Sequence, residues 1–242
     1  MLKRVLPVFW LISCLLFFFS KGVLSSAFAQ NELVFLEKAP KVNFTTAPLI
    51  LLLHGMGADE KDLWFIAQQL PQNYRILSLR APYRHESGGY RWFEIQFSSQ
   101  GKVMNYGQAQ QSCQSILRFL NSYLKQNGLL PQSIYVIGFS QGAMMGFLLL
   151  HSSSQIVGHA AIGGMIFPEL VQELKSSTLA NKNVWIAHGT RDEIIPVQAA
   201  RYARQILQNL GVNLSYHEFP VGHHITPDIL HALLAWLQKK VR

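Results

Sequence analysis

The sequence predicts an α/β protein in which one mainly parallel β-sheet is covered by helices on both faces. The first observation is a set of short apolar runs without polar alternation, such as "PLILLLHG" at 48–55. Runs of this kind are typical of parallel strands that are buried on both faces. The second observation is that these runs alternate with amphipathic segments, which implies right-handed crossovers between parallel strands. We therefore expect one domain over residues 30–242.

After a short polar lead, the apolar runs predict the strands, in chain order, at 48–55, 74–82, 133–139, 158–165, 183–189 and 213–219. The segments between them predict helices. The longest of these segments ends at Gly128, and glycine commonly ends helices. The expected helices are 61–70, 107–128, 143–153, 168–175, 197–211 and 227–240. Ligands of such sheets bind at the carboxyl ends of the strands, so polar residues there are the candidate site residues.

Residues 1–29 have the pattern of a secretory signal peptide. A basic start precedes an apolar run over 5–19, and the segment ends in the small-x-small sequence Ala-Phe-Ala. We expect cleavage after this segment, which would place the mature chain in the periplasm or outside the cell.

Two alternatives to cleavage stay open. An uncleaved membrane anchor would need about 20 apolar residues, and Lys21 interrupts the run early. Lipidation at Cys14 would fit the lipobox-like sequence "LISC", but further apolar residues follow this cysteine where a polar mature start is expected.

The composition excludes several classes of protein. Only 14% of the residues are charged, which is unlike disordered or coiled-coil chains. Loss of 1–29 would lower the formal charge from +8 to about +5, and the remaining basic residues are scattered. We therefore expect no nucleic-acid partner, and a membrane partner only if the N-terminal segment is retained or the substrate is a lipid.

The cysteines and histidines predict neither a disulfide nor a metal site. Cys113 alone would remain after processing, and it shares a helical stripe with Ile116 and Leu120, which indicates a core thiol. The 9 histidines include no HxH or HExxH spacing, so we expect no metal.

The sequence "VIGFSQGAMM" places Ser140 between Gly138 and Gly142, directly after an expected strand. This G-x-S-x-G spacing is typical of a nucleophile elbow, in which a strand turns sharply into a helix and exposes the serine hydroxyl. The alternative is a small residue in a tight turn, because the same spacing also arises by chance.

A serine nucleophile needs a base and a group that orients the base. In α/β hydrolases the chain order is nucleophile, acid, histidine. Asp192 in "HGTRDEIIPV" and His223 in "FPVGHHITP" follow Ser140 in that order, each after an expected strand. Singly, they could be a loop acid and a turn residue. Their neighbours Glu193 and His224 remain alternatives for the acid and the base.

The oxyanion of a tetrahedral intermediate also needs hydrogen-bond donors. The main-chain N–H of Gln141, which follows the serine, is one candidate. The second is the N–H of Met56 in "HGMGADE", the loop after the first long strand, whose glycines allow a close approach of the backbone.

These motifs together resemble the phospholipase/carboxylesterase family of α/β hydrolases, which includes acyl-protein thioesterases and small bacterial carboxylesterases. The matching segments, in order, are "LLLHGMGADEKDLWFIAQQL", "RAP", "GGYRWFEI", "IGFSQGAM", "HGTRDEIIPV" and "GHHI". The resemblance covers about residues 48–238. It implies the α/β-hydrolase fold, the triad Ser140, Asp192 and His223, the amides of Met56 and Gln141 as the oxyanion hole, and no cofactor.

The resemblance has two departures. Glu94 stands where these enzymes usually have Asp, and 96–107 resembles a variable loop beside the acyl pocket but has no substrate signature. Trp92 and Phe93, on the loop just before it, could line the acyl pocket or pack in the core, and we expect the pocket because Gly88 and Gly89 place them on a loop.

The resulting hypothesis is an exported serine hydrolase that cleaves small carboxylic esters or thioesters. A lysophospholipase or lipase at a membrane surface is the alternative within hydrolases, and it would require an exposed apolar lid near 96–107. A non-catalytic binding protein on the same fold is the alternative from another class, and the three intact triad residues count against it.

Overall fold

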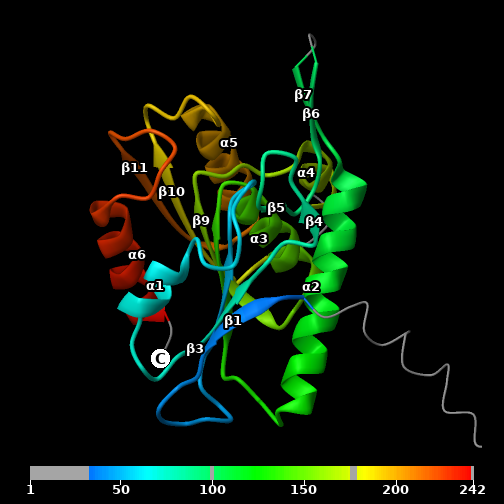
Figure 1. Ribbon diagram of the computed structural model, residues 1–242. Coiled ribbons are helices and arrows are strands. Elements are labelled where there is room, and N and C mark those ends of the chain that lie inside the picture. The colour runs from blue at the N-terminus through cyan, green and yellow to red at the C-terminus, as the bar shows by residue number, and fades with distance from the viewer. Residues whose placement is uncertain (1–32, 99–100, 175–178, 241–242) are drawn as a thin grey trace, which may run out of the picture. The chain divides into compact units, whose positions relative to one another are not determined.

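The computed structural model describes residues 33–98, 101–174 and 179–240. Its central sheet has seven strands in the order β1-β3-β2-β8-β9-β10-β11 (Figure 1). The strands are β1 (Phe35–Lys38), β2 (Leu49–Leu53), β3 (Arg75–Leu79), β8 (Ile134–Phe139), β9 (Ile156–Ile162), β10 (Asn183–Gly189) and β11 (Asn213–Phe219). All of these neighbours pair in parallel except β1, which runs antiparallel to β3. The predicted fold class is confirmed.

Helices cover both faces of this sheet because its strands are apolar on both sides. The helices are α1 (Trp64–Gln69), α2 (Tyr106–Gln126), α3 (Gln141–Ser152), α4 (Pro168–Leu174), α5 (Val197–Gln208) and α6 (Pro227–Lys240). Within β2, Leu51 packs in the cluster that holds the buried residues of α2 to α5, whereas Ile50 packs in the cluster of α1 and α6. Alternate residues of one strand thus reach two separate cores.

The edge strand β1 lies in the segment that the sequence presented only as a polar lead. It is short and half-buried, so it lacks the continuous apolar run of the central strands. Glu37 forms an ion pair with Arg75 of β3 and accepts a hydrogen bond from the hydroxyl of Tyr123 at 2.7 Å. These contacts to distant residues, together with its pairing to β3, hold the strand in place.

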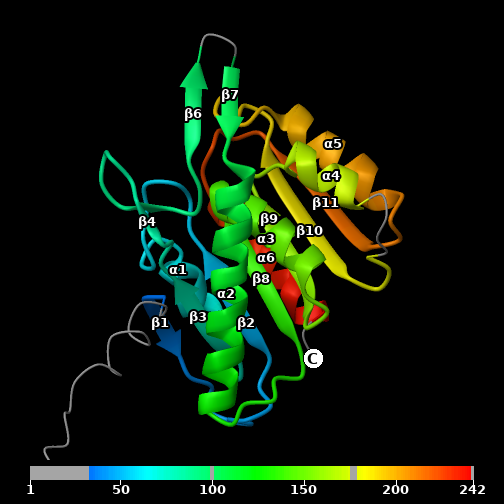
Figure 2. The same cartoon turned by 90° about the vertical axis from the view of Figure 1, so that its right-hand side faces the viewer.

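Two antiparallel hairpins follow β3. The first pairs β4 (Tyr83–Arg84) with β5 (Tyr90–Arg91), and the second pairs β6 (Ile95–Ser98) with β7 (Gly101–Met104). Figure 2 shows the β6–β7 hairpin projecting from the body of the molecule. The stretch that was expected to be a variable loop is therefore largely this hairpin.

The expected signal peptide and Cys14 lie outside the described residues. Among the residues that are described, no helix is long and apolar enough to cross a membrane. Cys113 is a buried free thiol, as expected, and its burial raises its pKa to about 11.

Candidate active site

Ser140 lies at a sharp turn between the end of β8 and the start of α3. Its backbone has φ 54° and ψ −116°, a conformation that residues with a side chain rarely adopt. A Cβ on Gly138 would lie 2.3 Å from the carbonyl oxygen of Gly142, and a Cβ on Gly142 would lie 2.0 Å from that of Leu53. The two glycines of the motif are therefore required by the close approach of the backbone at this turn.

Three side chains from three different loops form a hydrogen-bonded chain at this turn. The Nε2 atom of His223 lies 2.9 Å from the Oγ atom of Ser140. The Nδ1 atom of the same ring lies 2.6 Å from the Oδ2 atom of Asp192. A carboxylate can only accept, so Nδ1 carries the hydrogen and Nε2 is free to accept the hydroxyl proton of Ser140.

The structure also separates the alternatives that the sequence left open. Asp192 is buried, and its Oδ1 atom accepts hydrogen bonds from the main-chain N–H groups of Ile194 and Ile195 at 2.9 and 2.8 Å. Glu193 is exposed, and so is His224. The hydrogen-bonded chain therefore includes Asp192 and His223, and neither neighbour takes part in it.

His188 supports Asp192 from the end of β10. Its Nε2 atom donates a hydrogen bond to the carbonyl of Ile195 at 2.7 Å and lies 3.3 Å from the Oδ2 atom of Asp192. This contact of His188 with Asp192 was not predicted from the sequence. The side chain of His188 is fully buried against the carboxylate, so it fixes the loop that carries Asp192.

Gln141 is the first residue of α3, where a main-chain N–H has no partner within the helix. Its side chain is held by the main chain of the β5–β6 connection. The N–H of Trp92 donates to Oε1 at 2.7 Å, and Nε2 donates to the carbonyl of Phe93 at 2.7 Å. The other expected amide belongs to Met56, which lies with Ser140 and Gln141 on the wall of one cavity.

This cavity has a volume of about 620 Å³. Its wall comes from the β6–β7 hairpin, α3 and the loop before α5, and it is mostly apolar. The lining residues are Met56, Ile95, Lys102, Met104, Ser140, Gln141, Met144, Met165, Glu193, Ile194, Ile195, Pro196 and Ala199. Most of them were not predicted, because the hairpin and the 193–196 loop meet only in the folded chain. The signal in the sequence for part of this wall was the segment 96–107, which resembles a variable loop beside the acyl pocket and holds Lys102 and Met104.

The expectation that Trp92 and Phe93 line the pocket is wrong. Both side chains are 0% exposed, and neither belongs to the cavity wall. Trp92 donates its indole N–H to the carbonyl of His54 at 2.9 Å, and Phe93 packs against Phe167. These two residues pack in the core behind the site and hold its loops, while the chain turns outward at Ile95 to form the wall.

Within the described residues, no three His, Cys, Asp or Glu side chains are grouped in a way that could hold a metal ion. The groups that surround Ser140 are suited to proton transfer and to hydrogen bonding of an anion. This is the set of functions that acyl transfer to a serine requires.

The chain resembles esterases and thioesterases over most of its length. An acyl-protein thioesterase 1 from Saccharomyces cerevisiae is 25% identical over 211 residues, which cover 79% of this chain and 92% of the relative. The solved structure of esterase PE8 has a TM-score of 0.77 and 26% identity, and the match covers 86% of this chain and 99% of that one.

The match to a third relative is shorter. An acyl-protein thioesterase 1 from Gibberella zeae is 28% identical over 120 residues, which cover 48% of this chain and 51% of the relative, so this match spans about half of each chain. Residues 40–241 match the model of the family described as Phospholipase/Carboxylesterase. The fold, the elbow and this match together show that the chain belongs to the phospholipase/carboxylesterase family of α/β hydrolases.

Proposed function

We propose that the chain is an exported serine esterase that hydrolyses small carboxylic esters or thioesters with an apolar acyl group. The observation that carries the proposal is the hydrogen-bonded chain Ser140–His223–Asp192 on the wall of an apolar cavity. The family match supports ester or thioester hydrolysis as the reaction class.

In the first half of the proposed reaction, the Oγ atom of Ser140 attacks the carbonyl carbon of the ester. Its proton moves to Nε2 of His223, and Asp192 stabilises the imidazolium through Nδ1. The carbonyl oxygen becomes an oxyanion, which accepts hydrogen bonds from the amides of Met56 and Gln141. When the tetrahedral intermediate collapses, the C–O bond to the alcohol breaks and Nε2 gives its proton to the leaving oxygen.

In the second half, water hydrolyses the acyl-enzyme. Nε2 of His223 accepts a proton from the water as its oxygen attacks the acyl carbon. The second intermediate expels Ser140 Oγ, which takes the proton back, and the carboxylic acid leaves. Every proton is carried by His223, so the mechanism needs no cofactor.

The cavity wall supports an apolar acyl group. Four of its side chains are methionines, whose flexible thioethers adapt to chains of different length. Lys102 and Glu193 are the charged residues of the wall, so the charges it offers are few. We therefore infer that the acyl chain occupies the cavity.

The test is hydrolysis of p-nitrophenyl esters from acetate to dodecanoate by the purified protein and by Ser140→Ala. We expect turnover and labelling by a fluorophosphonate probe in the parent, and loss of both in the variant. Met165→Trp, which fills part of the cavity, should move the preference to shorter esters and retain labelling. Labelling that persists in Ser140→Ala would contradict the assigned nucleophile, and a parent without turnover would favour a binding protein.

A lysophospholipase is the second candidate, because apolar side chains are exposed close to the cavity. Val103, between two wall residues of β7, is 60% exposed, and Ile194 is 55% exposed. Such side chains would contact a lipid surface. Assays with lysophosphatidylcholine below and above its critical micelle concentration test this candidate, since a sharp rise in rate with micelles would favour it over the soluble-ester esterase.

The proposal that the enzyme is exported rests on the sequence of residues 1–29. Mass spectrometry of the protein from its native host should find a new N-terminus at about residue 30. An intact Met1 in the membrane fraction would instead support an uncleaved anchor, and a mass increase at Cys14 would support lipidation.

A further inference from the structure

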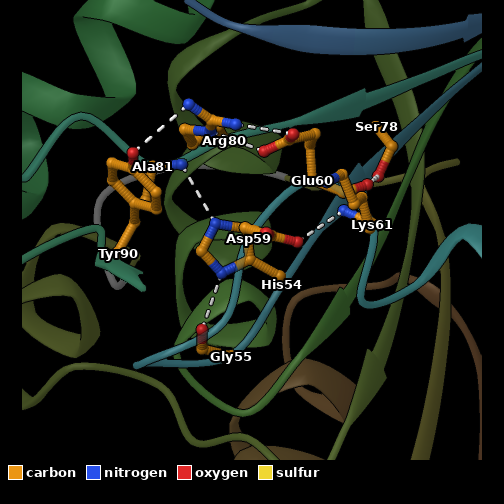
Figure 3. A network of polar contacts seen from close by, with 9 residues as sticks. All are labelled: His54, Gly55, Asp59, Glu60, Lys61, Ser78, Arg80, Ala81 and Tyr90. Carbon is orange, nitrogen blue, oxygen red and sulfur yellow. Dashed lines mark hydrogen bonds and ion pairs between the residues drawn. The ribbon is translucent and has the colours of Figure 1, made fainter. Parts of the chain in front are cut away.

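His54 lies at the end of β2, directly before the loop that carries Met56. It is 1% exposed and is bonded at both ring nitrogens (Figure 3). Nδ1 lies 2.7 Å from the carbonyl oxygen of Gly55, and Nε2 lies 3.0 Å from the main-chain nitrogen of Ala81. A carbonyl only accepts and an N–H only donates, so the ring is neutral with its hydrogen on Nδ1. Burial lowers the pKa of His54, which agrees with a neutral ring.

The bond to Gly55 determines the direction of the next amide. The carbonyl of Gly55 and the N–H of Met56 belong to one planar trans peptide unit, so they point in opposite directions. When Nδ1–H holds the carbonyl on the side of the His54 ring, the N–H of Met56 must point away from that ring. Met56 lies on the cavity wall with Ser140, whereas His54 does not.

The other ring nitrogen ties His54 to the end of β3, which is cross-linked to the same loop. Arg80 forms a two-point ion pair with Glu60, with nitrogen–oxygen distances of 2.5 and 2.7 Å, and Ser78 donates to the main-chain carbonyl of Glu60 at 2.7 Å. Figure 3 shows these bonds on one side of His54. The hydrogen bond from Ala81 thus joins the His54 ring to a segment that is itself bonded to the loop.

The rest of the loop is held independently of His54. The N–H of Gly57 donates to the carbonyl of Tyr90 at 2.8 Å, and the N–H of Tyr90 donates to the carbonyl of Ala58 at 2.8 Å. The N–H of Ala58 also reaches the carbonyl of Gly55, at the longer distance of 3.3 Å. Loss of the His54 donor should therefore loosen one peptide unit without unfolding the loop.

We propose that His54 is a positioning residue that aims the amide of Met56 at the oxyanion. This inference rests on the proposed esterase function, because an amide aimed into the cavity matters only if an oxyanion forms there. His54 does not touch the reacting atoms; it acts through the peptide unit between Gly55 and Met56.

Two substitutions separate the two bonds of the ring. The amide nitrogen of Asn can take the place of Nδ1, whereas the amide of Gln reaches the place of Nε2. His54→Asn therefore keeps a donor for Gly55 and loses the acceptor for Ala81, and His54→Gln does the reverse. Loss of one oxyanion donor costs about 10²–10³ in kcat, so misdirection of one should cost about 10- to 100-fold.

The experiment measures kcat, KM and Tm for both variants, together with the Ki of a trifluoromethyl ketone, whose hemiketal adduct carries an oxyanion. We expect His54→Gln to lower kcat 10- to 100-fold with little change in KM, and to raise Ki by a similar factor. We expect His54→Asn to retain at least about a fifth of kcat. His159→Gln is the matched control, because His159 is an equally buried histidine whose Nδ1 and Nε2 atoms lie 3.2 and 2.9 Å from the main-chain carbonyl oxygens of Val136 and Ala143, and it should lower only Tm.

The inference is overturned if His54→Gln keeps its kcat and Ki, or if both His54 variants lose activity in proportion to their loss of Tm. A parent protein without Ser140-dependent hydrolysis would instead refute the proposed function itself. The two failures are therefore distinguishable.

Discussion

His223 and His224 are adjacent in the chain but lie in different surroundings. His223 is half-buried and bonded to Ser140 and Asp192, whereas His224 is exposed. Gly222 precedes them, and Gly189 packs so closely on this turn that a Cβ there would lie 2.4 Å from the carbonyl oxygen of Gly222. This backbone contact holds the turn against β10, and of the two rings it is that of His223 that lies within hydrogen-bond distance of Ser140.

We predict that His223→Ala lowers kcat by at least about a thousandfold, because the serine loses its base and the unit of three residues is broken. His224→Ala should cost about tenfold or less, through a small disturbance of its neighbour. Both variants are assayed on one soluble ester, with fluorophosphonate labelling as a second measure. If His224→Ala is inactive and His223→Ala is active, the base is His224 and our assignment of His223 is wrong.

The elbow between β8 and α3 depends on backbone contacts that leave no room for a side chain. A Cβ on Gly138 would lie 2.3 Å from the carbonyl oxygen of Gly142 and 2.6 Å from the main-chain nitrogen of Ala143. Main-chain atoms of a strand and a buried helix cannot move aside without separating the two elements. The glycine therefore fixes the geometry of the element pair as well as the exposure of Ser140.

We predict that Gly138→Ala destabilises the protein by at least about 3 kcal/mol, because it forces backbone atoms apart at the centre of the fold. Gly107, in the first turn of α2, is the matched control. A Cβ there would meet its nearest atom at 3.6 Å, so Gly107→Ala should stabilise by about 0.5 kcal/mol. Urea unfolding of both variants measures these changes, and a Gly138→Ala protein as stable as the parent would refute the steric argument.

The whole molecule encloses a histidine that its sheet and helix layers shield from water. His159 of β9 is 0% exposed, and its ring packs against Gly146 and Phe147 of α3. Burial lowers its pKa from 6.5 to about 4, because the charged form would lose its hydration. The native state therefore resists protonation at a pH at which the unfolded chain accepts a proton.

We predict that the stability of the whole protein falls as the pH is lowered from about 6.5 to about 4. The sign follows from linkage, because the pKa of His159 is lower in the native state than in the unfolded chain. The contribution of His159 to the free energy of unfolding is therefore complete above its unfolded pKa, and it is lost as the pH falls through its native pKa. The loss from His159 is on the order of 3 kcal/mol. Urea unfolding between pH 7 and pH 4 measures it, and His159→Gln should have the shallower dependence; equal slopes would exclude this residue as the cause.

The order of elements and three of the residues brought together at the site were readable from the sequence, because both depend on local chemistry. Apolar runs specify buried strands wherever they lie, and the glycines around Ser140 specify a sharp turn whatever surrounds it. Asp192 and His223 were found because each follows a strand that ends at the same edge of the sheet. The edge strand β1 was missed, since its position depends on Arg75 and Tyr123, far along the chain.

Only the tertiary structure decided which way individual side chains turn. The choice of Asp192 over Glu193 and of His223 over His224 depends on hydrogen bonds across 31 residues or more. Trp92 was expected on the pocket wall, but its main chain bonds to Gln141, 49 residues away, and its ring enters the core. Such contacts have no local pattern, because a side chain's direction is set by distant neighbours that the fold brings to it.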